Sequence, residues 1–275
     1  MTKKIPLPVT SRNESFTERT VTKIWQERPS QENPYIAESA RCHGYDLHEL
    51  MEKRSFIDVL YLLFRSELPT IEESKILEQL MIGLINPGPR HPATRAAMNA
   101  GVGKTDPLHI LPIALTIYGG NANAAGSIEA TMRFFRKHRN SDPTQLANEL
   151  ASNRPMDIEG DWQVAPGFSS SYGGIDIMAS KLAAQLSTLD GCGPSLTWGM
   201  KFAENLSQYQ LGWYHSGVAA AVLSDLGFQP RVCGGLFQMF ASPGLFAHGV
   251  ELANKPRTAM PYVKDENYLI EYENE

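Results

Sequence analysis

An arginine and a histidine stand side by side in Pro89-Arg90-His91-Pro92, at the expected start of a helix. A guanidinium can bind a carboxylate through two parallel hydrogen bonds, and a helix N-terminus also favours an anion. Arg90 and His91 are therefore a candidate carboxylate-binding pair. The alternative, in which Thr94 caps the helix and Arg90 lies in solvent, agrees with the sequence equally well.

A second histidine and two hydroxyl groups could supply proton transfer and hydrogen bonds. His215 precedes an apolar helical pattern, and an imidazole, which titrates at about pH 6.5 in model peptides, suits general-base work. Tyr118 and Ser170 are candidate donors, and Ser170 lies between Ser169 and Ser171 in a run of glycines and serines. His215 could equally be a polar residue at a helix start. Ser170 could be a nucleophile only within a suitable Ser-His-Asp arrangement.

The segment 101–105, Gly-Val-Gly-Lys-Thr, is similar to the end of a phosphate-binding loop. That loop needs a further glycine five residues before the glycine of its Gly-Lys pair, and Met98 stands at that position. The preceding segment also has a helical pattern and not that of a strand. We therefore favour a turn between helices over a nucleotide site.

Four potential metal ligands lie close together in the sequence, namely Cys42, His43, Asp46 and His48. A zinc site usually combines ligands from one helical face or from closed loops, and no second cluster accompanies this one. We therefore expect no metal.

The composition excludes several classes of protein. The 275 residues carry a formal net charge of −5 and no long run of Lys or Arg, so we expect no nucleic-acid partner. No stretch of about 18 apolar residues is present, so we expect no membrane partner. The N-terminus lacks the apolar core of a secretory signal, and three scattered cysteines fit a reducing compartment, so we expect a cytoplasmic protein.

The segments that would position the candidate residues have helical patterns. Apolar residues over 56–64 recur with helical spacing, Thr70 and Glu73 form a capping box, and Asp106-Pro107 and Asp142-Pro143 are typical helix starts. Further helices are expected over 176–188, 194–210, 216–226 and 230–252. Because no alternating pattern persists, the sequence predicts an all-α fold. Residues 1–34 are expected to form an extended N-terminal arm and residues 35–275 a helical domain, with a smaller lobe at roughly 153–230.

These segments, taken in order, resemble the citrate synthase superfamily, and the short chain resembles its citryl-CoA lyase branch. The resemblance covers about residues 35–263, although each motif is weak alone. It rests on Gly44–Leu47, Tyr61–Thr70, Asn86–Pro89, Tyr118–Ala122, Gly167–Ser170 with Asp176, Ser216-Gly217, and Gly244 with His248 and Glu251. It implies a helical fold with a large and a small lobe, a coenzyme A thioester as substrate, and a homodimer.

The polar positions that the family uses for catalysis depart from its pattern. Pro87 stands where the family has a histidine that binds the oxo acid, and Tyr118 and Ser170 replace two further histidines. The segment 212–215 has no carboxylate where the family has its aspartate base, and Ala241 replaces an arginine. Because the family's Claisen chemistry needs a base and donors to the developing oxyanion, the inherited mechanism is absent.

Two main functions remain open from the sequence. The first is an enzyme with a diverged site, acting on an acyl-CoA or a polycarboxylate and forming or breaking a C–C bond. Its catalytic residues would be His215, Tyr118 and Ser170, and its substrate-binding residues would be Arg90, His91, His248, Ser169 and Ser171. The second is a non-catalytic protein that binds a CoA thioester or an organic acid, or that partners an active homologue. A helical interaction protein without a small-molecule site is a third. We favour the first because the polar segment 167–174 is typical of a ligand-facing loop.

Overall fold

The computed structural model describes residues 19–153, 162–261 and 263–269. The chain divides into two compact units, Met1–Glu67 and Leu68–Glu275. The boundary expected at residue 34 lies inside the first unit, between its first two strands, and most of the expected arm, residues 1–18, lies outside the described residues.

The first unit combines a small antiparallel sheet with two helices. Strands β1 (Trp25–Pro29), β2 (Ala37–Cys42) and β3 (Tyr45–Asp46) follow one another in the sheet. Helices α1 (Leu47–Lys53) and α2 (Phe56–Arg65) come next, and Asp46 and Ser55 cap their first turns. The sequence did not predict these strands, because β1 is exposed along its whole length and therefore lacks an alternation of apolar and polar residues.

The second unit is built of helices, which confirms the predicted fold class. Its helices are α3 (Ile71–Leu84), α4 (Pro92–Val102), α5 (Pro107–Tyr118), α6 (Ile128–His138), α7 (Pro143–Ser152), α8 (Ile177–Ser187), α9 (Pro194–Leu206), α10 (His215–Asp225) and α11 (Pro230–Ala253). Two short strands, β4 (Phe168–Ser169) and β5 (Gly212–Trp213), pair antiparallel. Thr70, Asp106 and Asp142 cap α3, α5 and α7 as the sequence predicts.

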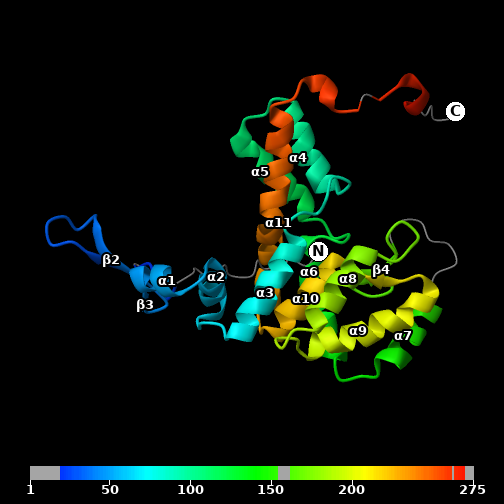
Figure 1. Ribbon diagram of the computed structural model, residues 1–275, viewed down its shortest axis with the longest axis horizontal. Coiled ribbons are helices and arrows are strands. Elements are labelled where there is room, and N and C mark those ends of the chain that lie inside the picture. Colours follow the sequence, from blue (N-terminus) through cyan, green and yellow to red (C-terminus); the bar gives the residue numbers. More distant parts are fainter. Residues whose placement is uncertain (1–18, 154–161, 262, 270–275) are drawn as a thin grey trace, which may run out of the picture. The chain divides into compact units, whose positions relative to one another are not determined.

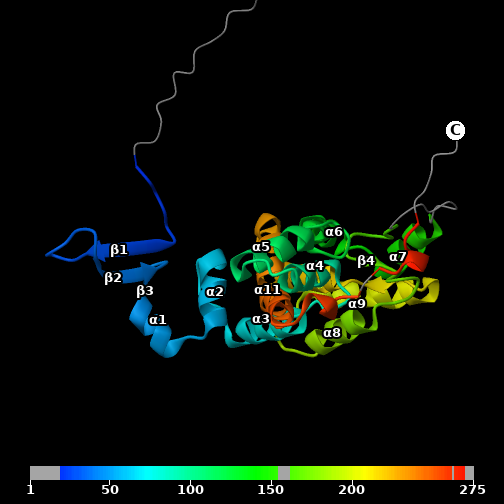
Figure 2. The same ribbon diagram turned by 90° about the horizontal axis from the view of Figure 1, so that it is seen from above.

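The longest helix of this unit, α11, lies beside α4 and α5 (Figures 1 and 2). At the junction with α4, the backbones of Gly101 and Gly249 touch, which only glycine allows. Lys104 donates from Nζ to the carbonyl oxygen of Ala253 at 2.7 Å, beside the C-terminus of α11. Lys104, the lysine of the segment that is similar to a phosphate-binding loop, therefore binds the C-terminal end of α11.

Helix α10 runs through the centre of the second unit, and residues 216–223 are all buried. Its start is fixed by the segment before β4. Tyr214 donates its backbone N–H to the carbonyl oxygen of Gly167 at 2.9 Å, and Gly217 packs directly against the Gly167 backbone. Gly167 has a φ of +81°, so glycine is needed there for the turn as well as for the contact. This packing fixes where His215, the first residue of α10, can lie.

Candidate functional site

Four helix ends of the second unit meet at a cavity of about 130 Å³. His91 caps α4, Tyr118 ends α5, Asp176 caps α8 and His215 begins α10. The cavity is completed by Gly83, Leu84, Asn86, Pro87 and Asn123. Because helix ends leave polar backbone groups and their capping side chains at one place, this junction brings polar groups together.

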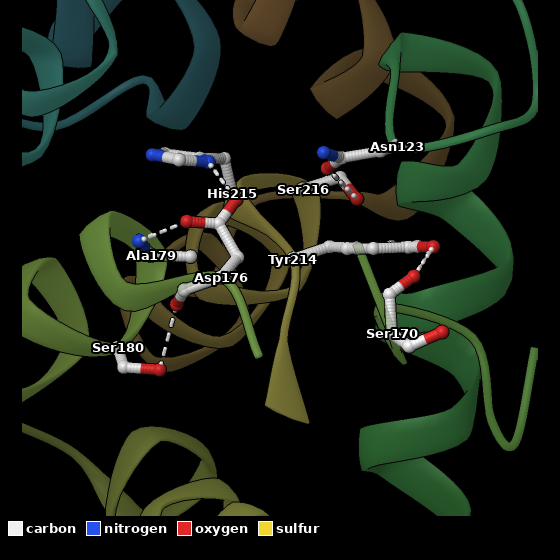
Figure 3. A network of polar contacts seen from close by, with 8 residues as sticks. All are labelled: Asn123, Ser170, Asp176, Ala179, Ser180, Tyr214, His215 and Ser216. Atoms are coloured by element: carbon white, nitrogen blue, oxygen red, sulfur yellow. Dashed lines mark hydrogen bonds and ion pairs between the residues drawn. The ribbon is translucent and has the colours of Figure 1, made fainter. Parts of the chain in front are cut away.

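His215 and Asp176 face each other at the cavity (Figure 3). The distance from His215 Nδ1 to Asp176 Oδ2 is 3.3 Å, and the two side chains are 31% and 18% exposed. Asp176 also accepts the backbone N–H of Ala179 at 3.0 Å, which fixes its carboxylate at the start of α8. Burial alone would raise the pKa of Asp176, but these hydrogen bonds outweigh it and hold the pKa below its usual range.

The contact with Asp176 determines which nitrogen of His215 can act as a base. A carboxylate only accepts hydrogen bonds, so Nδ1 of His215 must carry a proton in order to face Asp176. In the neutral ring, Nε2 then has the free lone pair. The pair therefore presents a base whose conjugate acid a fixed carboxylate would stabilise.

His91 has the opposite tautomer. Its Nδ1 accepts the backbone N–H of Ala93 at 3.1 Å, so the neutral ring carries its proton on Nε2 and is a donor there. Burial lowers the pKa of His91, and the nearby His215 lowers it further. Within the cavity, His91 can therefore donate a hydrogen bond from Nε2, while a neutral His215 with its proton on Nδ1 can accept one at Nε2.

Tyr118 lies against His91, with 5.0 Å between the ring centroids, and stacks on Phe237 at 5.2 Å. The residue is 4% exposed, and burial raises the pKa of its phenol well above the usual range. The hydroxyl is therefore protonated at neutral pH and can donate a hydrogen bond.

Asn123 supplies a further donor next to α10. Its Oδ1 accepts a hydrogen bond from Ser216 Oγ at 3.4 Å (Figure 3), and none of the described residues accepts a hydrogen bond from its Nδ2. Its backbone has a φ of +49°, a conformation that Asn tolerates better than most residues. The side-chain amide is thus oriented at the cavity by a buried serine.

The predicted residues fall into two groups. His91, Tyr118 and His215 line the cavity together. His248 does not line it but contacts Asn86, which does, with 3.2 Å between His248 Nε2 and Asn86 Nδ2. Arg90 is exposed and does not line the cavity.

Ser169, Ser170 and Ser171 do not line the cavity, and their hydrogen bonds hold the loop in which they lie. Ser169 donates to the Trp162 carbonyl at 2.7 Å, and Ser171 exchanges backbone hydrogen bonds with Gly174. Ser170 accepts the Tyr214 hydroxyl on its carbonyl oxygen at 3.0 Å, and Tyr214 extends away from His215 in Figure 3.

Sequence reasoning missed Asp176, Asn86 and Asn123. A carboxylate was sought just before Ser216, whereas the one that faces His215 comes from the start of α8. The available signal was the position of Asp176 directly before a helical pattern, which identifies a helix cap but not its second partner.

Among the described residues, no three His, Cys, Asp or Glu side chains come together as metal ligands would. None of the described helices has the length and apolar character that crossing a membrane requires.

Comparison with known proteins finds similarity in structure. No protein-family model matches the sequence, and no curated protein does. The citryl-CoA lyase of Hydrogenobacter thermophilus matches 93% of this chain and 95% of its own, with a TM-score of 0.72 and 24% identity.

Two further solved structures have a ligand named with them. The ATP citrate lyase of Methanothrix soehngenii, in complex with citrate and coenzyme A, has a TM-score of 0.68 and 16% identity; the match spans 94% of this chain but 44% of that one. The citrate synthase of Thermoplasma acidophilum, with carboxymethyl coenzyme A and oxaloacetate, has a TM-score of 0.58 and 18% identity over 80% of this chain and 58% of its own. This chain has the helical fold that these citryl-CoA lyase, ATP citrate lyase and citrate synthase structures share.

Proposed function

We propose that this protein is an enzyme that transfers a proton at the carbon next to the carbonyl of a CoA thioester. The proton is removed when a C–C bond forms and is returned to that carbon when the bond breaks. The observation that carries the proposal is the His215–Asp176 pair, which borders a cavity whose other polar groups are donors. Proton abstraction beside a carbonyl requires this combination of one base with donors to the developing enolate oxygen.

Each group has a role that follows from its hydrogen bonds. His215 Nε2 takes the proton, and Asp176 stabilises the imidazolium that forms. The Nε2–H of His91 and the hydroxyl of Tyr118 stabilise the enolate oxygen, and Asn123 Nδ2 offers a third donor. The mechanism thus replaces the carboxylate base that the resemblance implies with a carboxylate-supported imidazole.

The solved relatives support a CoA thioester as one substrate, since they are described with coenzyme A, citryl-CoA or carboxymethyl coenzyme A. A carboxylic acid such as citrate or oxaloacetate is the other substrate named with them. The three cysteines are unpaired, which is consistent with a reducing compartment.

The test is hydrogen exchange at the α-carbon of a thioester. Acetyl-CoA is incubated with the protein in D₂O, and deuterium in the acetyl group is followed by mass spectrometry. We expect exchange with the wild-type protein and a loss of at least a hundredfold in His215→Gln. His109→Gln, which changes an exposed histidine on α5, is the matched control and should exchange normally. Wild-type exchange no faster than the buffer blank would refute the proposal.

The alternative is a protein that binds a CoA thioester without turnover. The exposed Arg90 and the backbone engagement of Ser170 favour it, because neither contributes to the cavity. Stabilisation against heat by acetyl-CoA without any exchange would select this alternative. A ligand at a hundred times its Kd adds about 2.7 kcal/mol, which a thermal shift detects.

We also propose that the protein forms a homodimer through α5 and α11. Large apolar side chains are exposed on these two packed helices: Leu108, Ile113, Ile117, Met239 and Phe246. Apolar exposure of this kind is typical of an interface. Light scattering after size exclusion should give a dimer for the wild-type protein and a monomer for Ile117→Glu; a wild-type monomer would contradict the proposal.

A further inference from the structure

A second cavity of the second unit lies where α6 and α10 end and α9 and α11 begin. Its wall includes Arg136, Arg139, Ser195, Ser224 and Pro230. Its volume is about 160 Å³, and one water molecule needs roughly 10–15 Å³ of such volume, so a group of several atoms fits here.

Helix α10 separates this cavity from the one described above. His215 begins α10 and lines the first cavity, whereas Ser224, near the end of α10, lines the second. The nine residues between them correspond to about 14 Å at 1.5 Å per residue. The two cavities share no described lining residue, so a ligand of the second is not a ligand of the first.

Two arginines give the second cavity a positive charge. Arg136 lies in the last turn of α6 and Arg139 directly follows that helix. Both are exposed, so an ion can reach them from solvent. Neither forms a salt bridge with a described carboxylate, and the described lining residues include no Asp or Glu.

Asp225 lies close to Arg139 but is engaged at the start of α9. Its two carboxylate oxygens accept the backbone N–H groups of Ser195 at 2.8 Å and Leu196 at 2.9 Å. Burial raises the pKa of Asp225, although these hydrogen bonds and the charge of Arg139 act in the opposite direction. Two guanidinium groups beside at most one carboxylate leave a net positive charge.

Hydrogen-bond donors add to this charge. Gln229 provides no side-chain cap at the start of α11, where Pro230 lines the cavity. The uncapped N–H groups of a helix start and its dipole both favour an anion. Ser195 is 1% exposed, and its Oγ forms no hydrogen bond of normal geometry with a described residue, although it lies near enough to Asp225 to lower the pKa of that carboxyl.

We propose that this cavity binds a phosphate group through Arg136 and Arg139, at a site separate from that of the proposed function. Arginine binds phosphate through two parallel hydrogen bonds, and a dianion matches two guanidinium groups in charge. A free phosphate ion and a phosphate monoester of a small molecule share this chemistry.

The test is a titration with inorganic phosphate at pH 7.5, with sodium chloride at equal ionic strength as the reference. Backbone amide signals are followed by NMR. We expect saturable shifts of Gly227 and Phe228, which line the cavity. The Kd for phosphate should rise at least tenfold in Arg136→Gln and in Arg139→Gln, because each loses a charged pair of donors.

Lys137→Gln is the matched control. Lys137 is exposed in the same last turn of α6 but does not line the cavity, so its loss changes the charge beside the helix end equally. Its Kd for phosphate should stay within twofold of the wild-type value. Urea denaturation should show that all three variants are folded, since the three side chains are exposed.

A second titration with glycerol phosphate distinguishes the two sources of the phosphate group. Tighter binding of the monoester than of inorganic phosphate assigns the site to a phosphorylated small molecule, and weaker binding assigns it to the free ion. Shifts no larger than those with chloride would overturn the proposal. So would an unchanged Kd in both arginine variants, or an equal weakening in Lys137→Gln, which would indicate general attraction to the basic end of α6.

Discussion

Replacing Asp176 with asparagine separates its electrostatic role from its structural one. The carboxylate lies 3.3 Å from His215 Nδ1 and also caps α8. Asparagine is as good a helix cap as aspartate, so the cap's contribution to the free energy of unfolding should be kept. The lowered pKa of Asp176 means that the ionised carboxylate adds stability at neutral pH, and asparagine loses only that part. What is lost at the site is the oxygen that faces His215. With the asparagine Oδ1 on the Ala179 N–H, its Nδ2 donor would face Nδ1, so both the tautomer with its proton on Nδ1 and the attraction between the carboxylate and the imidazolium are lost.

The size of that loss follows from the geometry. Two unit charges about 4 Å apart attract by about 4 kcal/mol at an effective dielectric constant of about 20. Since the side chains are 31% and 18% exposed, solvent screening reduces this, and we take about 2–3 kcal/mol. Loss of this attraction alone should lower the rate of α-proton exchange roughly 30- to 150-fold, at about 1.4 kcal/mol per factor of ten, and loss of the tautomer adds to the effect.

The assay is the kcat and KM of α-proton exchange in D₂O, with Asp142→Asn as the matched control. We expect kcat to fall and KM for acetyl-CoA to stay within about twofold, because Asp176 acts through His215. A kcat within twofold of wild type would refute the role assigned to Asp176. A large loss of stability together with activity would show instead that the helix cap dominates.

Three further predictions concern the groups around this pair. Tyr118→Phe should lower kcat for exchange by roughly 10- to 100-fold with little change in stability, because the ring keeps its stacking on Phe237; unchanged kcat would show that the hydroxyl is not a donor. The pKa of His91 is lowered in the folded state, so its protonation disfavours folding. The free energy of unfolding is then insensitive to this group above about pH 6.5 and falls as the pH drops below it. Urea denaturation at pH 7.5 and 5.5 should show a smaller fall for His91→Asn than for wild type, and equal falls would contradict this. Gly217→Ala should destabilise by about 1–3 kcal/mol, because its Cβ would meet the Gly167 carbonyl oxygen, whereas Gly235→Ala, with open space around it, should be neutral or stabilising by up to about 1 kcal/mol; equal effects in chemical denaturation would argue against the close approach.

The helices were predictable from the sequence because their signals are local. The capping box at Thr70 and the Asp-Pro starts at Asp106 and Asp142 determine helix ends from neighbouring residues alone. The strands were not, because β1 is exposed and β4 and β5 have two residues each, too short for any periodicity.

The candidate site was predictable only in part, for a related reason. His91, Tyr118 and His215 could be named as chemical groups, and the fold brings them together at helix ends. The partnership of His215 with Asp176 joins α10 to α8, and no local pattern encodes a contact between helices. Arg90 was predicted to bind substrate beside His91, but it is exposed and does not line the cavity. Neighbouring residues at a helix start point in different directions, so adjacency in the sequence does not bring both side chains to one site.

The proposed role of His215 is that of a base toward a carbon acid. The decisive measurement is the rate of deuterium incorporation into acetyl-CoA, compared between the wild-type protein and His215→Gln at equal folded concentration. We expect incorporation by the wild-type protein and a loss of at least a hundredfold in the variant. Equal incorporation by both proteins, or none above the buffer blank by either, would contradict it.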